Sequence, residues 1–145
     1  KIIFKLALPL KSKDKLLAAI ALMFAFPGVP CLYYGTEIGL EGGYDPDSRR
    51  TFNWEEKSWD KKFLNHIKAI ISMKKNECIQ NGDVSISSKA DLLIIKRKWK
   101  RNVLTFQVNL GTEKQAVILP EFTLLDKGLQ GNGFLLPYGY VFYET

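Results

Sequence analysis

A loop predicted over residues 36–59 carries the side chains whose types and spacing could do chemistry. Asp45 can accept two hydrogen bonds from hydroxyl groups, and Arg49, four residues later, can donate several from its planar guanidinium. Such groups suit a polyhydroxylated ligand. The spacing by itself favours a simpler interpretation, in which Asp45 and Arg49 form a salt bridge on the surface. Glu37, near the start of the loop, could bind ligand or pair with a neighbouring arginine.

The segment before this loop predicts one helix–strand step of an α/β protein. Residues 16–26 are rich in helix formers and apolar on all sides, which is typical of a helix buried on most of its surface. Pro27 and Gly28 end that run, and the apolar run 29–34 predicts a fully buried strand. Long loops in compact domains are usually functional or disordered. The aromatic residues of 36–59 argue against disorder.

An amphipathic helix is predicted over residues 60–75. Its apolar residues recur at steps of three and four, which gives one apolar stripe with lysines elsewhere. His66, the only histidine of the chain, lies beside Phe63 and Ile67 in this pattern. We interpret His66 as a residue on the flank of the helix rather than as a ligand or a catalytic group.

Beyond residue 76 the hydrophobic period changes to two residues, and turn residues separate short apolar runs. This pattern predicts an antiparallel sandwich or barrel. The expected strands are 84–87, 92–98, 103–110, 116–119, 122–125 and 140–143. The change of period predicts two domains, 1–75 and 76–145, with the boundary near 75–79.

Charge and composition argue against several classes of partner. The net charge of +6 could favour nucleic acid, but the lysines are scattered among acidic residues. The one basic cluster, 96–101, is predicted to surround a hairpin tip, where lysines oppose edge-to-edge aggregation. Prolines interrupt the uncharged run 16–35, so it does not predict a membrane helix. Two cysteines do not make a disulfide framework. We expect no nucleic-acid partner, no membrane contact, no metal and no cofactor.

The stretch from Phe26 to Arg50 reads FPGVPCLYYGTEIGLEGGYDPDSRR, and Phe52-Asn53-Trp54 follows it. It resembles glycoside hydrolase family 13, the alpha-amylase family, most closely its neopullulanase, cyclomaltodextrinase and maltogenic amylase group. In that family F-P-G-x-P-x-x-Y-Y-G-x-E is the last barrel strand, and D-P-x-x-R lies on the loop after it. This sequence departs from the family at Thr36 and Asn53.

The resemblance implies an α+β fragment. Residues 1–75 would be the tail of a (β/α)8 barrel, comprising a helix, the last strand, the long loop and the last helix. Residues 76–145 would be an all-β antiparallel sandwich. The start of the chain lacks a signal-peptide pattern and an initiator Met, so we expect it to be cut from a longer protein. We also expect a cytoplasmic location.

The resemblance also assigns roles to residues. Asp45 and Arg49, with Glu37, would bind substrate, the first two on the non-reducing side of the cleaved bond. Retaining hydrolysis needs a carboxylate nucleophile and a carboxylic acid, and in the family an aspartate that stabilises the transition state as well. In the family these three lie upstream of the F-P-G-x-P phrase, so no catalytic residue is expected here.

The leading hypothesis is therefore a C-terminal portion of an alpha-amylase-type glycosidase. The intact enzyme would act on alpha-glucosidic bonds of starch-like oligosaccharides or cyclodextrins, with an alpha-glucan or maltooligosaccharide as its ligand. The isolated chain is expected to be inactive. The alternatives are a non-catalytic glucan-binding β-module and, less in keeping with the charge pattern, a basic nucleic-acid module.

The predicted strand 29–34 has a further consequence. A buried-type strand hydrogen-bonds to neighbours on both sides, and this chain does not supply them. We therefore expect self-association through residues 16–34, which would bury the helix and strand against another copy or against the chain's own β-domain. Residues 76–145 are expected to be self-contained.

Overall fold

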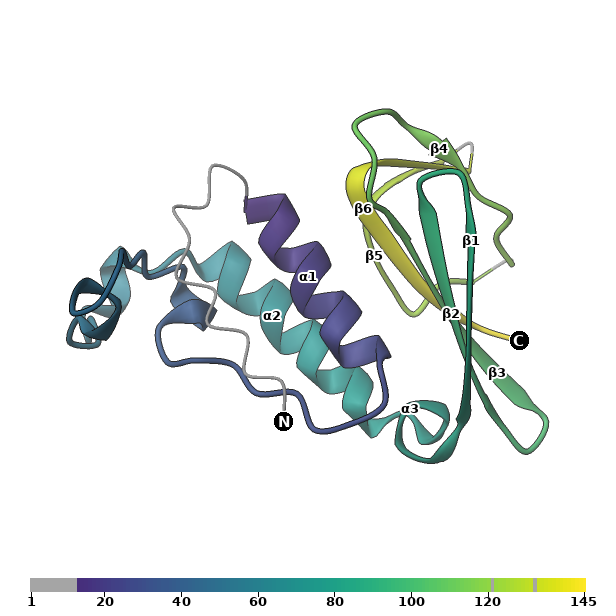
Figure 1. Ribbon diagram of the computed structural model, residues 1–145, viewed down its shortest axis with the longest axis horizontal. Helices are drawn as coiled ribbons and strands as arrows, with labels where there is room; N and C mark the ends of the chain where they lie inside the picture. The colour runs from purple at the N-terminus through teal and green to yellow at the C-terminus, as the bar shows by residue number, and fades with distance from the viewer. Residues whose placement is uncertain (1–12, 121, 132) are drawn as a thin grey trace.

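The computed structural model describes residues 13–120, 122–131 and 133–145, and its helices lie on one side of a β-sheet (Figure 1). Residues 1–12, part of the first predicted domain, lie outside the described residues. The α-helices are α1 (Lys13–Ala25), α2 (Lys61–Ser72) and α3 (Glu77–Asn81). The short 3₁₀ turns are η1 (Thr36–Ile38), η2 (Asp47–Arg49), η3 (Glu56–Ser58) and η4 (Met73–Lys75).

The two longer helices follow the predicted hydrophobic patterns. α1 is buried on several sides, which confirms the helix predicted over 16–26. α2 begins after Asp60, whose carboxylate accepts a hydrogen bond of 3.0 Å from the backbone N–H of Phe63 and so caps the helix. Ile67 and Ile70 continue the buried stripe that Phe63 begins. The three- and four-residue spacing therefore located both the helix and its buried face.

The strand predicted over 29–34 is wrong. The backbone of 29–33 is irregular, and no strand of the described residues pairs with it. Val29 is 95% exposed, and Cys31 and Tyr34 are exposed too. A strand is held by hydrogen bonds to its neighbours, so an apolar run without a neighbouring strand has no ladder to join.

The C-terminal half forms one antiparallel sheet of six strands within the described residues. The strands are β1 (Asp83–Lys89), β2 (Leu92–Trp99), β3 (Asn102–Asn109), β4 (Gln115–Ala116), β5 (Leu125–Gln130) and β6 (Phe134–Glu144). Their order is β1-β2-β3-β6-β4, and β5 also pairs with β6. β2 and β3 pair along their full lengths, which confirms the predicted hairpin.

This single sheet corrects the prediction of a sandwich. β6 has eleven residues and pairs with β4 near its start and with β3 along its second half, while β5 follows its other edge. β6 bends at Tyr138, which has a φ of 58°, and at Gly139, where a Cβ would lie 2.8 Å from the Leu136 oxygen. The six strands therefore form one curled sheet rather than two separate sheets.

The strand predicted at 122–125 is also misplaced. Ladder pairing with β6 begins at Leu125 and continues to Gln130. Phe122, which suggested the earlier start, is 76% exposed. Its apolar side chain is therefore not part of a buried strand face.

A hydrophobic cluster joins the helices to the sheet. Phe106, Tyr140 and Phe142 are at most 1% exposed and face buried residues of α1, α2 and α3. The Phe106 and Phe142 rings lie 4.6 Å apart between centroids. The helix α1 is thus buried against the chain's own sheet, one of the two outcomes expected for it. Self-association with another copy stays a prediction.

Arg97 ties the helices to the sheet through backbone groups. It lies on β2, is 4% exposed, and its guanidinium donates to the carbonyl oxygens of Ala25 at 3.3 Å, Ile79 at 2.8 Å and Gly82 at 3.1 Å. These carbonyls lie at the C-terminal ends of α1 and α3, where the last helical carbonyls lack partners within the helix. Arg97 therefore belongs to the core, although the sequence places it in the basic cluster 96–101.

Candidate functional site

Loop 36–59 projects from the helices on the side away from the sheet (Figure 1). It starts at Gly35, which has a φ of 84° and whose carbonyl accepts a hydrogen bond of 2.8 Å from the Leu40 N–H. A Cβ at Gly35 would lie 2.7 Å from Leu40 Cδ2. The first turn therefore requires glycine. Glu37 lies in this turn, half-buried.

The outer ion pair joins Asp45 and Arg49. The Arg49 Nε donates to one carboxylate oxygen at 2.9 Å, and Nη2 donates to the other at 2.6 Å. Ser48 Oγ adds a hydrogen bond of 3.0 Å to Asp45. The side chains are 52% and 65% exposed for Asp45 and Arg49, respectively. The structure thus brings together two of the three predicted site residues, in the bidentate geometry that the salt-bridge interpretation requires.

Glu37 is not drawn into this pair. In the described part of the chain, the carboxylates that Arg49 and Arg50 contact are Asp45 and Asp47, and neither arginine bonds to Glu37. The alternative in which Glu37 pairs with a neighbouring arginine is therefore not seen.

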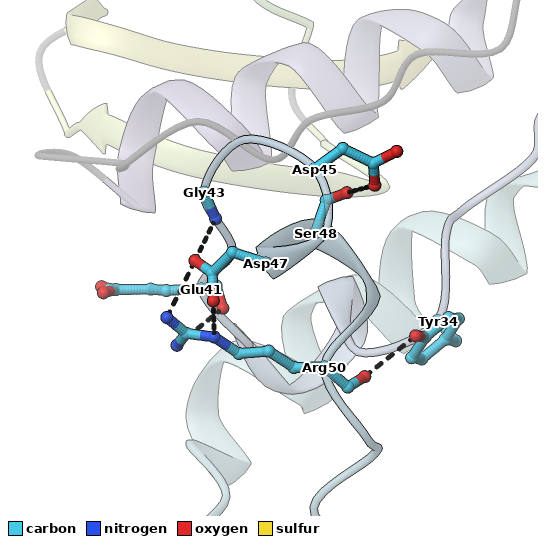
Figure 2. A network of polar contacts seen from close by, with 7 residues as sticks. All are labelled: Tyr34, Glu41, Gly43, Asp45, Asp47, Ser48 and Arg50. Carbon is cyan, nitrogen blue, oxygen red and sulfur yellow. Dashed lines mark hydrogen bonds and ion pairs between the residues drawn. The ribbon is translucent and has the colours of Figure 1, made fainter.

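An inner ion pair, Asp47 with Arg50, closes the loop from inside (Figure 2). The Arg50 Nε and Nη2 donate to the two Asp47 oxygens at 2.6 and 2.9 Å. The Asp47 carboxylate also accepts a hydrogen bond of 2.8 Å from the Gly43 N–H. Arg50 Nη1 donates a hydrogen bond of 3.4 Å to the backbone carbonyl of Glu41. The Tyr34 hydroxyl donates to the Arg50 carbonyl at 2.9 Å. These contacts hold residues 34–50 together as a closed unit.

Sequence reasoning missed this inner pair. Asp47 begins the one-turn helix η2 and Arg50 directly follows its end. Their spacing of three residues allows pairing, and it was the available signal. Hydrogen bonding to Arg50 lowers the pKa of Asp47, and the same contact raises the pKa of Arg50. Figure 2 shows Asp45 pointing away from this network. The two adjacent arginines therefore have different partners.

The hollow beside the inner pair is small. It has a volume of about 30 Å³ and is lined by Tyr34, Glu41, Asp47 and Arg50 among others. A volume of this size holds about one or two water molecules. A sugar bound to this loop would therefore lie on its open surface rather than in a pocket.

Aromatic residues fill the last part of the loop. Trp59 is half-buried, and its indole N–H donates to the Asn53 carbonyl at 2.8 Å. Phe52 contacts both Trp54 and Trp59 in edge-on geometry, with centroids 4.7 and 5.8 Å apart. Trp54 is 80% exposed. Trp59 is thus a packing anchor of the loop, whereas Trp54 is open to solvent.

His66 lies outside the loop, on α2. Its Nε2 contacts the Tyr140 hydroxyl in the core, and the two rings meet edge-on at 5.8 Å. Burial lowers the pKa of His66, with a smaller contribution from Lys127, while Asp126 opposes the shift. Burial also raises the pKa of Tyr140. The contact links helix to sheet, in keeping with the prediction that His66 lies on the flank of α2.

The described residues offer neither a metal site nor a membrane-spanning helix. No group of three or more His, Cys, Asp or Glu side chains among them could hold a metal ion. None of the helices in this part of the chain combines the length and apolar character needed to cross a membrane.

Known proteins resemble this chain over most of its length, although no family profile matches it. It is 32% identical over 105 residues to the cyclomaltodextrinase of Thermoanaerobacter pseudethanolicus. This alignment covers 71% of this chain and 18% of that protein. It is 34% identical over 117 residues to the intracellular maltogenic amylase of Bacillus subtilis strain 168, which covers 77% of this chain and 20% of the relative.

A solved structure agrees with these relatives. The crystal structure of maltogenic amylase from S. marinus matches with a TM-score of 0.81 and 33% identity, over 91% of this chain and 19% of that one. The chain thus spans about a fifth of the length of the relatives it matches. By sequence and by fold, it belongs to the alpha-amylase family of glycoside hydrolases and matches a C-terminal portion of the cyclomaltodextrinase and maltogenic amylase group.

Proposed function

We propose that the whole protein hydrolyses alpha-glucosidic bonds in maltooligosaccharides or cyclodextrins, and that this chain supplies its substrate-binding loop. The observation that carries the proposal is the outer ion pair, which presents Asp45 and Arg49 on the open surface of loop 36–59. Relatives named cyclomaltodextrinase and maltogenic amylase support the substrate class.

The geometry of the outer pair suits sugar hydroxyls. Two of the five N–H donors of the Arg49 guanidinium point to Asp45, and the rest of this 65% exposed group can donate to a ligand. Pairing with Asp45 fixes the plane of the guanidinium before a ligand arrives, so less side-chain entropy is lost on binding. We assign Glu37, half-buried at the start of the loop, to the same site.

The catalytic carboxylates belong to another part of the protein in this proposal. Residues 1–75 are the end of the catalytic barrel and residues 76–145 are the C-terminal β-domain. The irregular segment 29–33 would then gain strand neighbours from the rest of the barrel. The protein acts in the cytoplasm, as the name of its intracellular maltogenic amylase relative suggests.

An activity comparison tests the proposal. We expect the full-length protein to release sugars from maltooligosaccharides and cyclodextrins. The isolated 145-residue chain should release none, because the catalytic carboxylates of a glycosidase act as a pair that it lacks. Failure of the full-length protein on all these substrates would refute the proposal. Turnover by the rigorously purified chain would show that its own residues are catalytic.

A binding titration distinguishes the alternative, a non-catalytic β-module. The 145-residue chain is titrated with maltohexaose, and the Asp45→Ala variant of the same chain serves as comparison. Binding that survives Asp45→Ala unchanged would favour a site on the sheet over the loop.

A further inference from the structure

Trp54 is exposed and at the same time held in place. Its side chain is 80% exposed, whereas Phe52 and Trp59, which it neighbours in the same loop, are half-buried. An exposed group that is already held in place loses little conformational entropy when it contacts a ligand, which favours binding.

The base beneath Trp54 is a short chain of contacts. Phe52 packs edge-on against Trp54 at 4.7 Å and against Trp59 at 5.8 Å. Trp59 is fixed by its hydrogen bond to the Asn53 carbonyl. The Asn53 side chain in turn accepts from the Glu55 N–H at 2.9 Å and donates to Ser58 Oγ at 2.8 Å. The indole of Trp54 therefore lies on a turn that ring contacts and hydrogen bonds hold in place.

The chemistry of the loop indicates what would cover this indole. A sugar ring has an apolar C–H face that packs on a flat aromatic surface, and hydroxyl groups that need charged or polar partners. Loop 36–59 offers both kinds of group, an exposed indole and the exposed Asp45–Arg49 pair. Its hollow of about 30 Å³ cannot enclose a sugar ring. A sugar on this loop therefore needs a flat surface to lie on.

We propose that Trp54 is a stacking platform for one glucosyl unit of an alpha-glucan substrate. The proposal rests on the proposed function of the loop and adds a residue to it. Phe52 acts as a positioning residue, since it supports the Trp54 ring.

Steady-state kinetics of the full-length protein on a series of maltooligosaccharides tests the platform. Trp54→Ala should raise KM about 3- to 10-fold for the oligosaccharides long enough to reach it, and change kcat by less than about twofold. Trp54→Phe keeps a ring face and should stay within about twofold of wild type. Phe122→Ala, which removes an exposed aromatic side chain from the sheet side of the molecule, is the matched control and should have no effect.

A fluorescence titration gives a second readout that does not depend on turnover. Maltohexaose should change the tryptophan emission of the wild-type protein and of Trp99→Phe, and this change should be lost in Trp54→Phe. If Trp54→Ala fails to fold, Trp54→Gln, which keeps bulk without a ring, replaces it in the kinetic series.

Two results would refute the proposed role of Trp54 without refuting the proposed function of the protein. The first is an active wild-type protein whose KM is unchanged by Trp54→Ala or Trp54→Gln on every oligosaccharide. The second is a Trp54 that is shielded from acrylamide in the full-length protein without sugar, which would mean that protein covers it. A wild-type protein inactive on all substrates would instead refute the proposed function.

Discussion

At the junction of helices and sheet, Arg97 is 4% exposed and donates to three backbone carbonyls, whereas Arg49 and Arg50 of loop 36–59 are more than half exposed and pair with carboxylates. Burial lowers the pKa of Arg97, since it disfavours the charged form. The buried arginine has neutral partners at helix ends, and the exposed ones have charged partners close by in sequence. In the core, therefore, an arginine supports the fold, and in the loop it shapes a surface.

The largest expected effect is that of removing the buried guanidinium. Arg97→Met should lower the free energy of unfolding of the 145-residue chain by about 3 kcal/mol, because three backbone carbonyl groups, two of them in buried hydrogen bonds, lose a charged donor. Arg97→Lys should recover part of this, since an ammonium is a single point donor. Urea denaturation followed by circular dichroism measures both. An unchanged midpoint in Arg97→Met would mean that the comparison between core and loop is wrong.

Substitutions in the outer ion pair should weaken substrate binding rather than lower the stability of the fold. In the full-length protein, Asp45→Ala or Arg49→Ala should weaken oligosaccharide binding by about 1 to 3 kcal/mol, as for loss of a charged hydrogen-bond partner. The catalytic carboxylates should keep their function, so kcat should change less than KM. Glu56→Ala, an exposed acid of the same loop, is the control. Wild-type kinetics in both site variants would leave Asp45 and Arg49 as a surface salt bridge alone.

Protonation of His66 at low pH should lower the stability of the fold. Its folded pKa is lowered by burial, so near and below pH 6.5 the unfolded chain binds more protons than the folded one. Stability is therefore full above about pH 6.5, and it declines as the pH falls below that value. Urea midpoints at pH 7.5 and pH 5 should differ more for wild type than for His66→Gln. Equal pH dependence in the two proteins would exclude His66 as the cause.

The smallest global effect is expected for the inner ion pair. Asp47→Ala should leave the unfolding midpoint unchanged, because exposed pairs contribute little to stability. It should nevertheless speed amide exchange at Gly43, whose N–H donates to the Asp47 carboxylate. Amide exchange read by NMR in the 145-residue chain tests this. Slow exchange at Gly43 in the variant would show that Asp47 does not hold the loop closed.

Local sequence patterns determined the elements that depend on near neighbours. The apolar run 16–26 and the stripe of 60–75 became α1 and α2, because a helix needs only its own backbone bonds and one buried face. The hairpin of β2 and β3 followed from its period of two and the short turn between the strands. The spacing of Asp45 and Arg49 likewise indicated their contact, since both lie in one short loop.

Tertiary structure decided the features that depend on distant partners. The run 29–34 has the composition of a buried strand, but a strand also needs a neighbour, and the described residues provide none. The curl of the sheet arises where β6 bends at Gly139 and meets three strands in turn. Arg97 looked like one cation of a basic cluster, because nothing in its local sequence reveals helix ends that lie 15 to 72 residues away.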